Sequence, residues 1–180
     1  KIIELERSLP EPNKCSGTVG IAHTRWATHG EANELNAHPQ TDCTGKLAIA
    51  HNGIIENYVL LKEQLLELGH SFRSDTDTEV LAHLIEQYQS TGLPLVEAVR
   101  EALSRVEGTY GLVVLHQDDP DCLIAVRKGS PLIIGIGDNE HFLASDPNAM
   151  LDLNASIRIT AWMTDAVRFM VGYRTDHAYA

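Results

Sequence analysis

Apolar residues recur with a helical period in three consecutive stretches near the middle of the chain. The members are Ile54, Tyr58, Leu61, Leu65 and Leu68, then Val80, Leu84, Ile85 and Tyr88, then Leu95, Val99, Ala102 and Val106. Steps of three and four residues place each set on one face of an α-helix. Gly69 and Gly92 are expected to end the first two helices, because glycine readily adopts the left-handed conformation that follows a helix C-terminus.

Short apolar runs typical of β-strands lie on both sides of these helices. They span residues 18–23, 46–51, 110–115, 123–126, 132–136 and 141–144, and two later runs, 156–162 and 167–171, are compatible with a final hairpin. Asn52-Gly53 ends the second run with a strong turn signal, and residues 118–121 form a turn between the third and fourth. Helices grouped between strands indicate an α+β protein rather than alternating βαβ units.

The bulk composition restricts the class of protein and its partners. The chain has 180 residues, 43% hydrophobic and 22% charged, as expected of one soluble globular domain. Its formal charge of −11 argues against a nucleic-acid partner, because neutralising phosphates requires clustered Lys and Arg. No run approaches the roughly 18 apolar residues of a membrane span, so we expect no membrane partner and a cytoplasmic location.

Cysteine and histidine spacing gives no sign of a metal site. The cysteines are Cys15, Cys43 and Cys122, which are odd in number and show no CxxC spacing. A disulfide framework or a zinc site is therefore not expected, and reduced thiols fit a cytosol. His23, His38 and His51 also lack a spacing typical of metal ligands, and we interpret them as buried, hydrogen-bonded histidines.

Two longer motifs carry more chemistry than the composition does. They read Gly20-Ile21-Ala22-His23-Thr24-Arg25-Trp26-Ala27-Thr28-His29-Gly30 and His51-Asn52-Gly53-Ile54-Ile55-Glu56-Asn57. Together they resemble the glutamine-handling core of the class II glutamine amidotransferases, and within that class the glutaminase domain of the glutamine–fructose-6-phosphate aminotransferase (isomerizing) family. Trp26 and the Gly-Ser-Pro-Leu segment at residues 129–132 favour this family over amidophosphoribosyltransferase, which tends to carry Tyr and Arg-Pro-Leu there. The similarity runs from about residue 17 to about residue 149.

The resemblance implies a fold and domain boundaries. The fold is the four-layer αββα sandwich of the N-terminal-nucleophile hydrolases, lacking its first strand or strands. Residues 1–17 are then a connector remnant, 18–155 a partial type 2 glutamine amidotransferase domain, and 156–180 a diverged C-terminal hairpin or tail. The sugar isomerase domains are expected to be absent, so fructose 6-phosphate binds only those missing domains. The full-length enzyme is expected to be a homo-oligomer.

The same resemblance implies a covalent mechanism whose nucleophile this sequence lacks. The family uses a cysteine at the first position of the mature chain, with its own α-amine as the base. This chain begins with Lys1, so we expect an N-terminally truncated fragment that is inactive alone. Cys15 leads directly into the strand that carries Arg25, where the family nucleophile does not lie, and Cys43 and Cys122 have no free amine.

Arg25 is the candidate for binding the α-carboxylate of L-glutamine, because a planar guanidinium matches a carboxylate with two parallel hydrogen bonds. The resemblance adds Thr28 and His29 to this part of the pocket. Asp77 corresponds to the aspartate that binds the α-ammonium group in the family. Asp77 also suits a helix N-terminus, and Thr76-Asp77-Thr78-Glu79 has the form of a capping box, so both roles stay open.

Asn52 and Gly53 are the candidates for an oxyanion hole. An amide side chain and the next backbone N–H can both donate to one oxygen where glycine lets the chain approach closely. The alternative is an ordinary hairpin turn, which fits badly with the helix expected from Ile54. Trp26 resembles the gate between the glutaminase pocket and the ammonia channel, although a single Trp is usually a core residue.

These motifs predict a glutaminase domain that hydrolyses L-glutamine to supply ammonia for glucosamine-6-phosphate synthesis. The resemblance implies neither a metal nor an organic cofactor in this domain. An alternative of a different class is a non-catalytic glutamine-binding regulatory module that kept the pocket without the nucleophile. A further alternative is the glutaminase domain of another amidotransferase, such as amidophosphoribosyltransferase.

Overall fold

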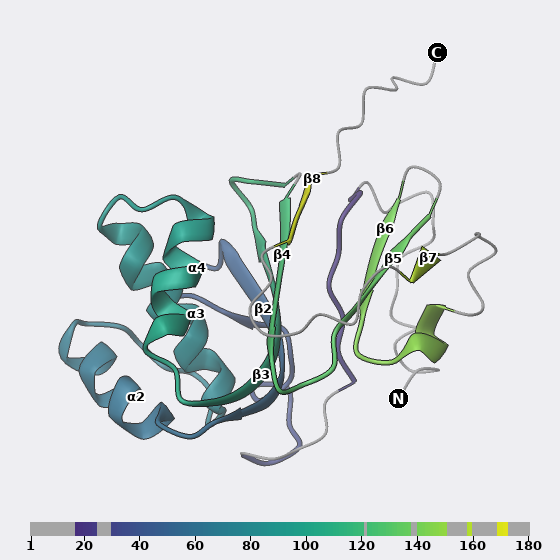
Figure 1. Ribbon diagram of the computed structural model, residues 1–180. Coiled ribbons are helices and arrows are strands. Elements are labelled where there is room, and N and C mark those ends of the chain that lie inside the picture. Colours follow the sequence, from purple (N-terminus) through teal and green to yellow (C-terminus); the bar gives the residue numbers. More distant parts are fainter. Residues whose placement is uncertain are drawn as a thin grey trace.

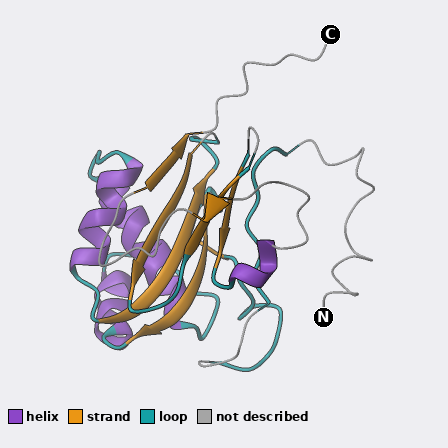
Figure 2. Cartoon of the chain, turned by 45° about the vertical axis from the view of Figure 1, so that its right-hand side comes forward, coloured by secondary structure: helices purple, strands orange, loops and turns teal. Residues whose placement is uncertain are grey.

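The computed structural model describes residues 17–24, 30–120, 122–137 and 140–150, together with the backbone of 158–159 and 169–172. Within these residues, a layer of helices covers one face of a five-stranded sheet, and a three-stranded sheet lies on the opposite side (Figures 1 and 2). The helices follow one another in sequence, and the strand pairs of both sheets are antiparallel. The predicted α+β class is therefore confirmed.

The larger sheet has the strand order β1-β2-β3-β4-β8 and the smaller one β6-β5-β7. The strands are β1 (Gln40–Thr41), β2 (Leu47–Ile55), β3 (Gly108–His116), β4 (Cys122–Lys128), β5 (Ile133–Ile136), β6 (His141–Ala144), β7 (Arg158–Ile159) and β8 (Phe169–Gly172). The helices are α2 (Tyr58–Glu67), α3 (Asp77–Ser90) and α4 (Leu95–Ser104), and the 3-10 helix η2 (Pro147–Met150) follows β6.

The main core lies between the helices and the larger sheet. The helices bury Leu61, Leu65, Val80, Leu84, Ile85, Val99 and Ala102, and the central strands meet them with Leu47, Ile49, Leu112, Val114 and Ile124. The strand residues alternate along the chain, so one face of the sheet is apolar, as a period of two requires. Gly69 and Gly92 follow α2 and α3 with φ angles of +94° and +90°, which confirms both predicted helix ends.

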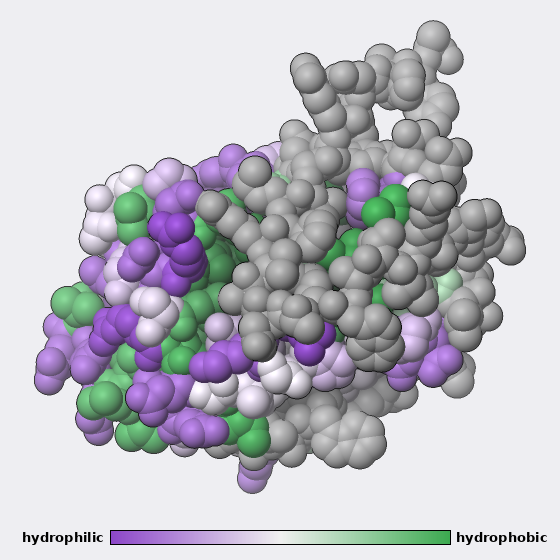
Figure 3. All heavy atoms as spheres, in the orientation of Figure 1, coloured by the Kyte–Doolittle hydropathy of each residue, from purple (hydrophilic) through white to green (hydrophobic). Residues whose placement is uncertain are grey.

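The apolar face predicted for the first helix is only partly correct. Leu61 and Leu65 are buried, but Leu68 is 60% exposed and Ile54 belongs to β2. Ile54 pairs with Thr109 of β3, so backbone pairing keeps it in the sheet and the helix begins only at Tyr58. Figure 3 shows the result on the surface, where apolar side chains lie beside hydrophilic ones over the helical layer.

The Asn52-Gly53 pair does not end the strand, contrary to the turn expected from the sequence. β2 continues through both residues to Ile55 and keeps its register with β3. Gly53 has a φ of +130°, and a Cβ there would lie 2.1 Å from the carbonyl oxygen of Thr109. Gly108 on β3 is similarly close to the Ile54 carbonyl. The glycine of the Asn-Gly pair therefore serves a close approach of β2 to β3 rather than a turn, because a residue with a Cβ would not fit there.

Two further predictions about strands are wrong. The runs 156–162 and 167–171 do not form a hairpin, because β7 pairs with β5 in the smaller sheet and β8 pairs with β4 in the larger one. Residues 17–24 form no strand, although Val19, Ile21 and His23 are partly buried and their neighbours are exposed. Side-chain alternation alone does not make a strand, and neither sheet pairs with this segment in the described part of the chain. No helix among the described residues is long and apolar enough to cross a bilayer.

Candidate active site

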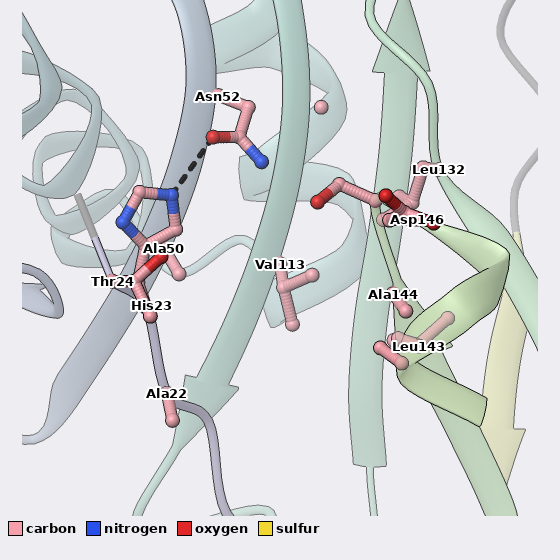
Figure 4. Close-up of a pocket in the computed structure, with 13 residues that line it drawn as sticks. Ala22, His23, Thr24, Ala50, Asn52, Val113, Leu132, Leu143, Ala144 and Asp146 are labelled. Carbon is pink, nitrogen blue, oxygen red and sulfur yellow. Dashed lines mark hydrogen bonds between the residues drawn. The ribbon is translucent and has the colours of Figure 1, made fainter. Parts of the chain in front are cut away.

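A cavity of about 420 Å³ opens between the two sheets. Its lining combines residues 22–24, the middle of β2 and β3, and the segment from β6 into η2 (Figure 4). The lining residues are Ala22, His23, Thr24, Ala50, Asn52, Gly111, Val113, Leu132, Leu143, Ala144, Ser145, Asp146 and Ala149. Small and apolar side chains form most of this wall, and its polar side chains are His23, Thr24, Asn52, Ser145 and Asp146.

The Asn52 side chain is oriented by a histidine. His23 Nε2 and Asn52 Oδ1 are 2.8 Å apart (Figure 4). An amide oxygen only accepts, so this contact assigns the proton to Nε2 of His23 and directs the two N–H groups of the Asn52 amide elsewhere. In Figure 4 the amide nitrogen of Asn52 points away from His23, towards the interior between the sheets. The amide therefore offers free donor capacity on the side of β2 that lines the cavity.

The histidines of this region form a chain of contacts. The rings of His23 and His38 lie 4.5 Å apart between centroids, and the backbone N–H of His51 donates to His38 Nδ1 at 3.4 Å. His51 is buried, and its Nδ1 lies 2.9 Å from Thr78 Oγ1. Burial lowers the pKa of His51, and the negative charge of Asp77 only partly opposes this effect, so His51 is neutral at pH 7. The interpretation of His51 as a buried, hydrogen-bonded histidine is confirmed.

Asp77 is the first residue of α3 and is only 3% exposed. Its Oδ2 accepts a hydrogen bond from the backbone N–H of Ile55 at 2.9 Å. The N-cap is Thr76, whose Oγ1 accepts from the Glu79 N–H at 3.3 Å, so capping and the role of Asp77 fall on separate residues. Asp77 and Gly53 are not among the described lining residues of the cavity, and their roles toward glutamine stay predictions.

Four predicted site residues lie outside the described residues. They are Arg25, Trp26, Thr28 and His29. Their neighbours in sequence, His23 and Thr24, line the cavity. The structure thus brings Asn52 to a cavity next to the start of the segment that carries these predicted residues.

Two residues that position the site, His23 and Thr78, are not predicted from the sequence in that role. The sequence indicates a buried histidine at His23 and a helix start at Thr78, whereas the structure shows them in contact with Asn52 and His51. The available signal was polarity inside otherwise apolar surroundings, since a buried polar side chain requires a partner. Pairing His51 with Thr78 requires the placement of β2 against α3, and pairing Asn52 with His23 requires the placement of residues 17–24 beside β2. Neither placement can be read from the sequence.

Comparison with known proteins identifies the class. A family model described as "Glutamine amidotransferase domain" matches residues 23–152. The chain belongs to this family. Among curated proteins, it is 56% identical to the glutamine–fructose-6-phosphate aminotransferase [isomerizing] of Thermococcus kodakarensis, over 76% of this chain and 23% of that protein. It is 59% identical to the protein of the same name from Pyrococcus horikoshii, over 75% of this chain and 23% of the relative. The chain thus spans about a quarter of the length of these relatives.

Solved structures give a consistent fold. The chain is similar to a glutamine phosphoribosylpyrophosphate amidotransferase from B. subtilis, with a TM-score of 0.62 and 31% identity over 76% of this chain and 29% of that one. It is similar to a structure described as the allosteric regulatory enzyme of purine biosynthesis with a TM-score of 0.64 and 31% identity, over 76% of this chain and 30% of that one. Each of these structures covers 76% of this chain, and the two curated relatives cover 76% and 75% of it.

Proposed function

We propose that this chain is the glutaminase part of a glutamine–fructose-6-phosphate aminotransferase, which releases ammonia from L-glutamine for transfer to fructose 6-phosphate on other domains. The observation that carries the proposal is the Asn52 amide, held by His23 at a cavity between two sheets. A tetrahedral oxyanion requires donors that are fixed before the reaction begins, because donors that must reorient contribute less. Fructose 6-phosphate is proposed as the acceptor of ammonia because the curated relatives, 56% and 59% identical to this chain, are named for it.

In the proposed reaction, a cysteine from the N-terminal segment implied by the class II resemblance attacks the amide carbon of glutamine. The negative charge that develops on the amide oxygen is stabilised by the Asn52 side-chain N–H and the Gly53 backbone N–H. Collapse of this intermediate expels ammonia and leaves a thioester, which water then hydrolyses to glutamate. Trp26 is proposed to separate this pocket from the path that ammonia takes.

Recognition of the two charged ends of glutamine is proposed to be divided. Arg25, with Thr28 and His29, binds the α-carboxylate, and Asp77 binds the α-ammonium group. A carboxylate and an ammonium group need partners of opposite charge where water is excluded. The burial of Asp77 at the start of α3 supports its ability to act on a cation in such surroundings.

We further assign the domain to the four-layer sandwich of the N-terminal-nucleophile hydrolases. The three described layers, helices followed by two sheets, support this assignment (Figure 1). We propose that the whole enzyme is a cytoplasmic homo-oligomer. The glutaminase domain of amidophosphoribosyltransferase is the second candidate, because the solved structures belong to that related group. Its 31% identity to this chain is well below that of the curated aminotransferases.

The test measures glutaminase activity of the chain joined upstream to the N-terminal cysteine segment of the family. Asn52→Ala should lower kcat roughly 100-fold, about 3 kcal/mol, with little change in KM, because an oxyanion donor acts mainly in the transition state. Asn148→Ala is the matched control, since Asn148 is exposed and its side chain is not part of the cavity lining. An unchanged kcat with a raised KM would make Asn52 a ground-state contact and refute the oxyanion role.

A second experiment tests the carboxylate site. Arg25→Ala should weaken glutamine binding by about 2–5 kcal/mol, because it leaves a desolvated charge without its partner. The same variant should bind a glutamine analogue with a neutral carboxamide in place of the α-carboxylate almost as well as the parent does. Equal losses toward both ligands would show that Arg25 acts on folding rather than on the carboxylate.

A further inference from the structure

Four side chains with metal-binding atoms converge away from the cavity. Cys43 lies in the turn between β1 and β2, His70 follows the end of α2, and His83 and Glu86 belong to α3. One ligand atom from each residue can be chosen so that all four atoms lie within 4.8 Å of one another. None of the four residues lines the cavity between the sheets. Three elements that are distant in sequence therefore meet at one cluster.

The distances suit a tetrahedral zinc ion. Cys43 Sγ lies 3.7 Å from His70 Nδ1 and 3.5 Å from His83 Nδ1. Bonds of about 2.3 Å to sulfur and 2.0–2.1 Å to nitrogen place these two atoms about 3.6 Å apart in a tetrahedron. Glu86 Oε2 lies 2.9 Å and 3.0 Å from the same two nitrogens, against about 3.3 Å around zinc. A shift of a few tenths of an ångström at Glu86 completes the geometry.

The outer nitrogens of both rings have partners that orient them. His83 Nε2 lies 3.4 Å from Glu79 Oε1, and His70 Nε2 lies 2.9 Å from Gln87 Oε1. Both oxygens accept, so each ring carries a proton on Nε2 and can turn its Nδ1 lone pair to the cluster. Histidines that bind metals usually donate their other N–H to such an acceptor, which fixes the tautomer and the plane of the ring.

The polar atoms of the cluster gather around Glu86 Oε2. This oxygen accepts a hydrogen bond from the Cys43 backbone N–H at 3.2 Å and lies 2.9 Å from His70 Nδ1 and 3.0 Å from His83 Nδ1. One divalent ion placed among these side chains would bind both Nδ1 lone pairs, the carboxylate oxygen and the Cys43 sulfur at a single point.

We propose that Cys43, His70, His83 and Glu86 form a zinc site that fastens the β1–β2 turn to α3. Thiolate, imidazole and carboxylate groups all bind zinc, and four protein ligands leave no open position for a substrate. The site is thus structural, and it departs from the expectation that cysteine spacing alone gave. The proposal does not depend on the glutaminase assignment, since it concerns a separate part of the molecule.

The experiment titrates zinc alone into the untagged, metal-free 180-residue chain and measures stoichiometry and affinity by competition with a chromophoric chelator. We expect one zinc ion per chain, and a Co2+ derivative with the near-ultraviolet charge-transfer band of a thiolate ligand. Cys43→Ser and His70→Gln should each weaken zinc binding by at least ~100-fold, since changes in outer-shell partners alone cost 10–100-fold. Cys122→Ser is the matched control and should bind zinc as the parent does.

Thermal unfolding of the same variants separates loss of the site from loss of the fold. Without metal, the Cys43→Ser variant should unfold at the same temperature as the parent, because Cys43 lies at the surface. Zinc should raise the unfolding temperature of the parent and of Cys122→Ser, but not that of Cys43→Ser. The proposal is overturned if the parent binds no zinc, or if Cys43→Ser and His70→Gln bind it with unchanged affinity.

Discussion

Glu79 is a carboxylate buried inside the helical layer, and its charge should contribute measurably to stability. Its Oε1 accepts from the Arg73 backbone N–H at 2.8 Å, and its Oε2 accepts from the N–H and the hydroxyl of Ser74, both at 2.7 Å. His83 Nε2 is a further donor at 3.4 Å. Glu79→Gln keeps the shape of the side chain, but it removes the charge and turns an NH2 group towards donors.

The size of the effect follows from the pKa of Glu79. Burial acts to raise this pKa, but the hydrogen bonds from His83, Arg73 and Ser74 outweigh burial and lower it from 4.5 to about 2. The pKa is lower in the folded chain, so the stabilisation is complete above pH 4.5 and is lost as the pH falls towards 2. A difference of about 2.5 units corresponds to about 3 kcal/mol. Adding the three short charged hydrogen bonds separately, at about 1.5–3 kcal/mol each, would give more, because that sum omits the cost of burying the charge.

The measurement is urea unfolding followed by circular dichroism between pH 7 and pH 3. EDTA is included so that zinc at the neighbouring cluster does not contribute. The free energy of unfolding of Glu79→Gln should lie about 3 kcal/mol below that of the parent at pH 7, and the gap should shrink below pH 4.5. Glu67→Gln, a change at an exposed residue at the end of α2, is the control. Its free energy of unfolding should equal that of the parent at every pH. A gap that stays constant down to pH 3 would refute the charge-based explanation.

Two further predictions concern the backbone and the buried contacts around β2. Gly53→Ala should cost at least ~4 kcal/mol or prevent folding, because its Cβ would collide with the Thr109 carbonyl at a φ of +130°. Gly45→Ala, at a φ of +74° with open space around it, should cost only about 1–2 kcal/mol, and urea unfolding of both variants compares them. Thr78→Val should cost about 1–3 kcal/mol in the same assay, because it removes the hydroxyl that His51 Nδ1 contacts. Retention of parental stability in Thr78→Val would show that this contact contributes nothing.

The helices were predictable because their signals are local. Their apolar periods, the glycines after α2 and α3, and the Thr76 cap all lie within a few residues of the feature they specify. Most strands were predictable from short apolar runs in the sequence, but the strand with which each one pairs was not. β7 and β8 lie close together in sequence, yet the chain places them at the edges of different sheets. No pattern within residues 156–171 records that choice.

The sequence motifs were sufficient to predict candidate site residues, but not the contacts between those residues. Asn52 emerged from a motif, and the structure places it at the cavity, whereas its dependence on His23 joins residues 29 positions apart. The Cys43 cluster shows the same limit more clearly, since Cys43 and His83 are 40 positions apart and share no recognisable spacing. Spacing rules detect ligands that one short segment supplies, and they miss ligands that the tertiary fold assembles.

Two residues of α3 contact β2 on either side of the Asn52-Gly53 pair in sequence, and these contacts determine which Asp77 variant can test its role. Thr78 contacts His51 just before the pair, and Asp77 accepts from the backbone of Ile55 just after it. Asp77→Ala would remove the hydrogen bond to β2 as well as the negative charge. A loss of glutamine turnover in that variant would therefore not distinguish an anchor for β2 from a binding site for the α-ammonium group.

Asp77→Asn keeps an oxygen that can accept from Ile55 and removes only the charge. If Asp77 binds the α-ammonium group, Asp77→Asn should weaken glutamine and leave unaffected an analogue that lacks that group. If Asp77 only anchors β2, Asp77→Asn should bind both ligands as the parent does.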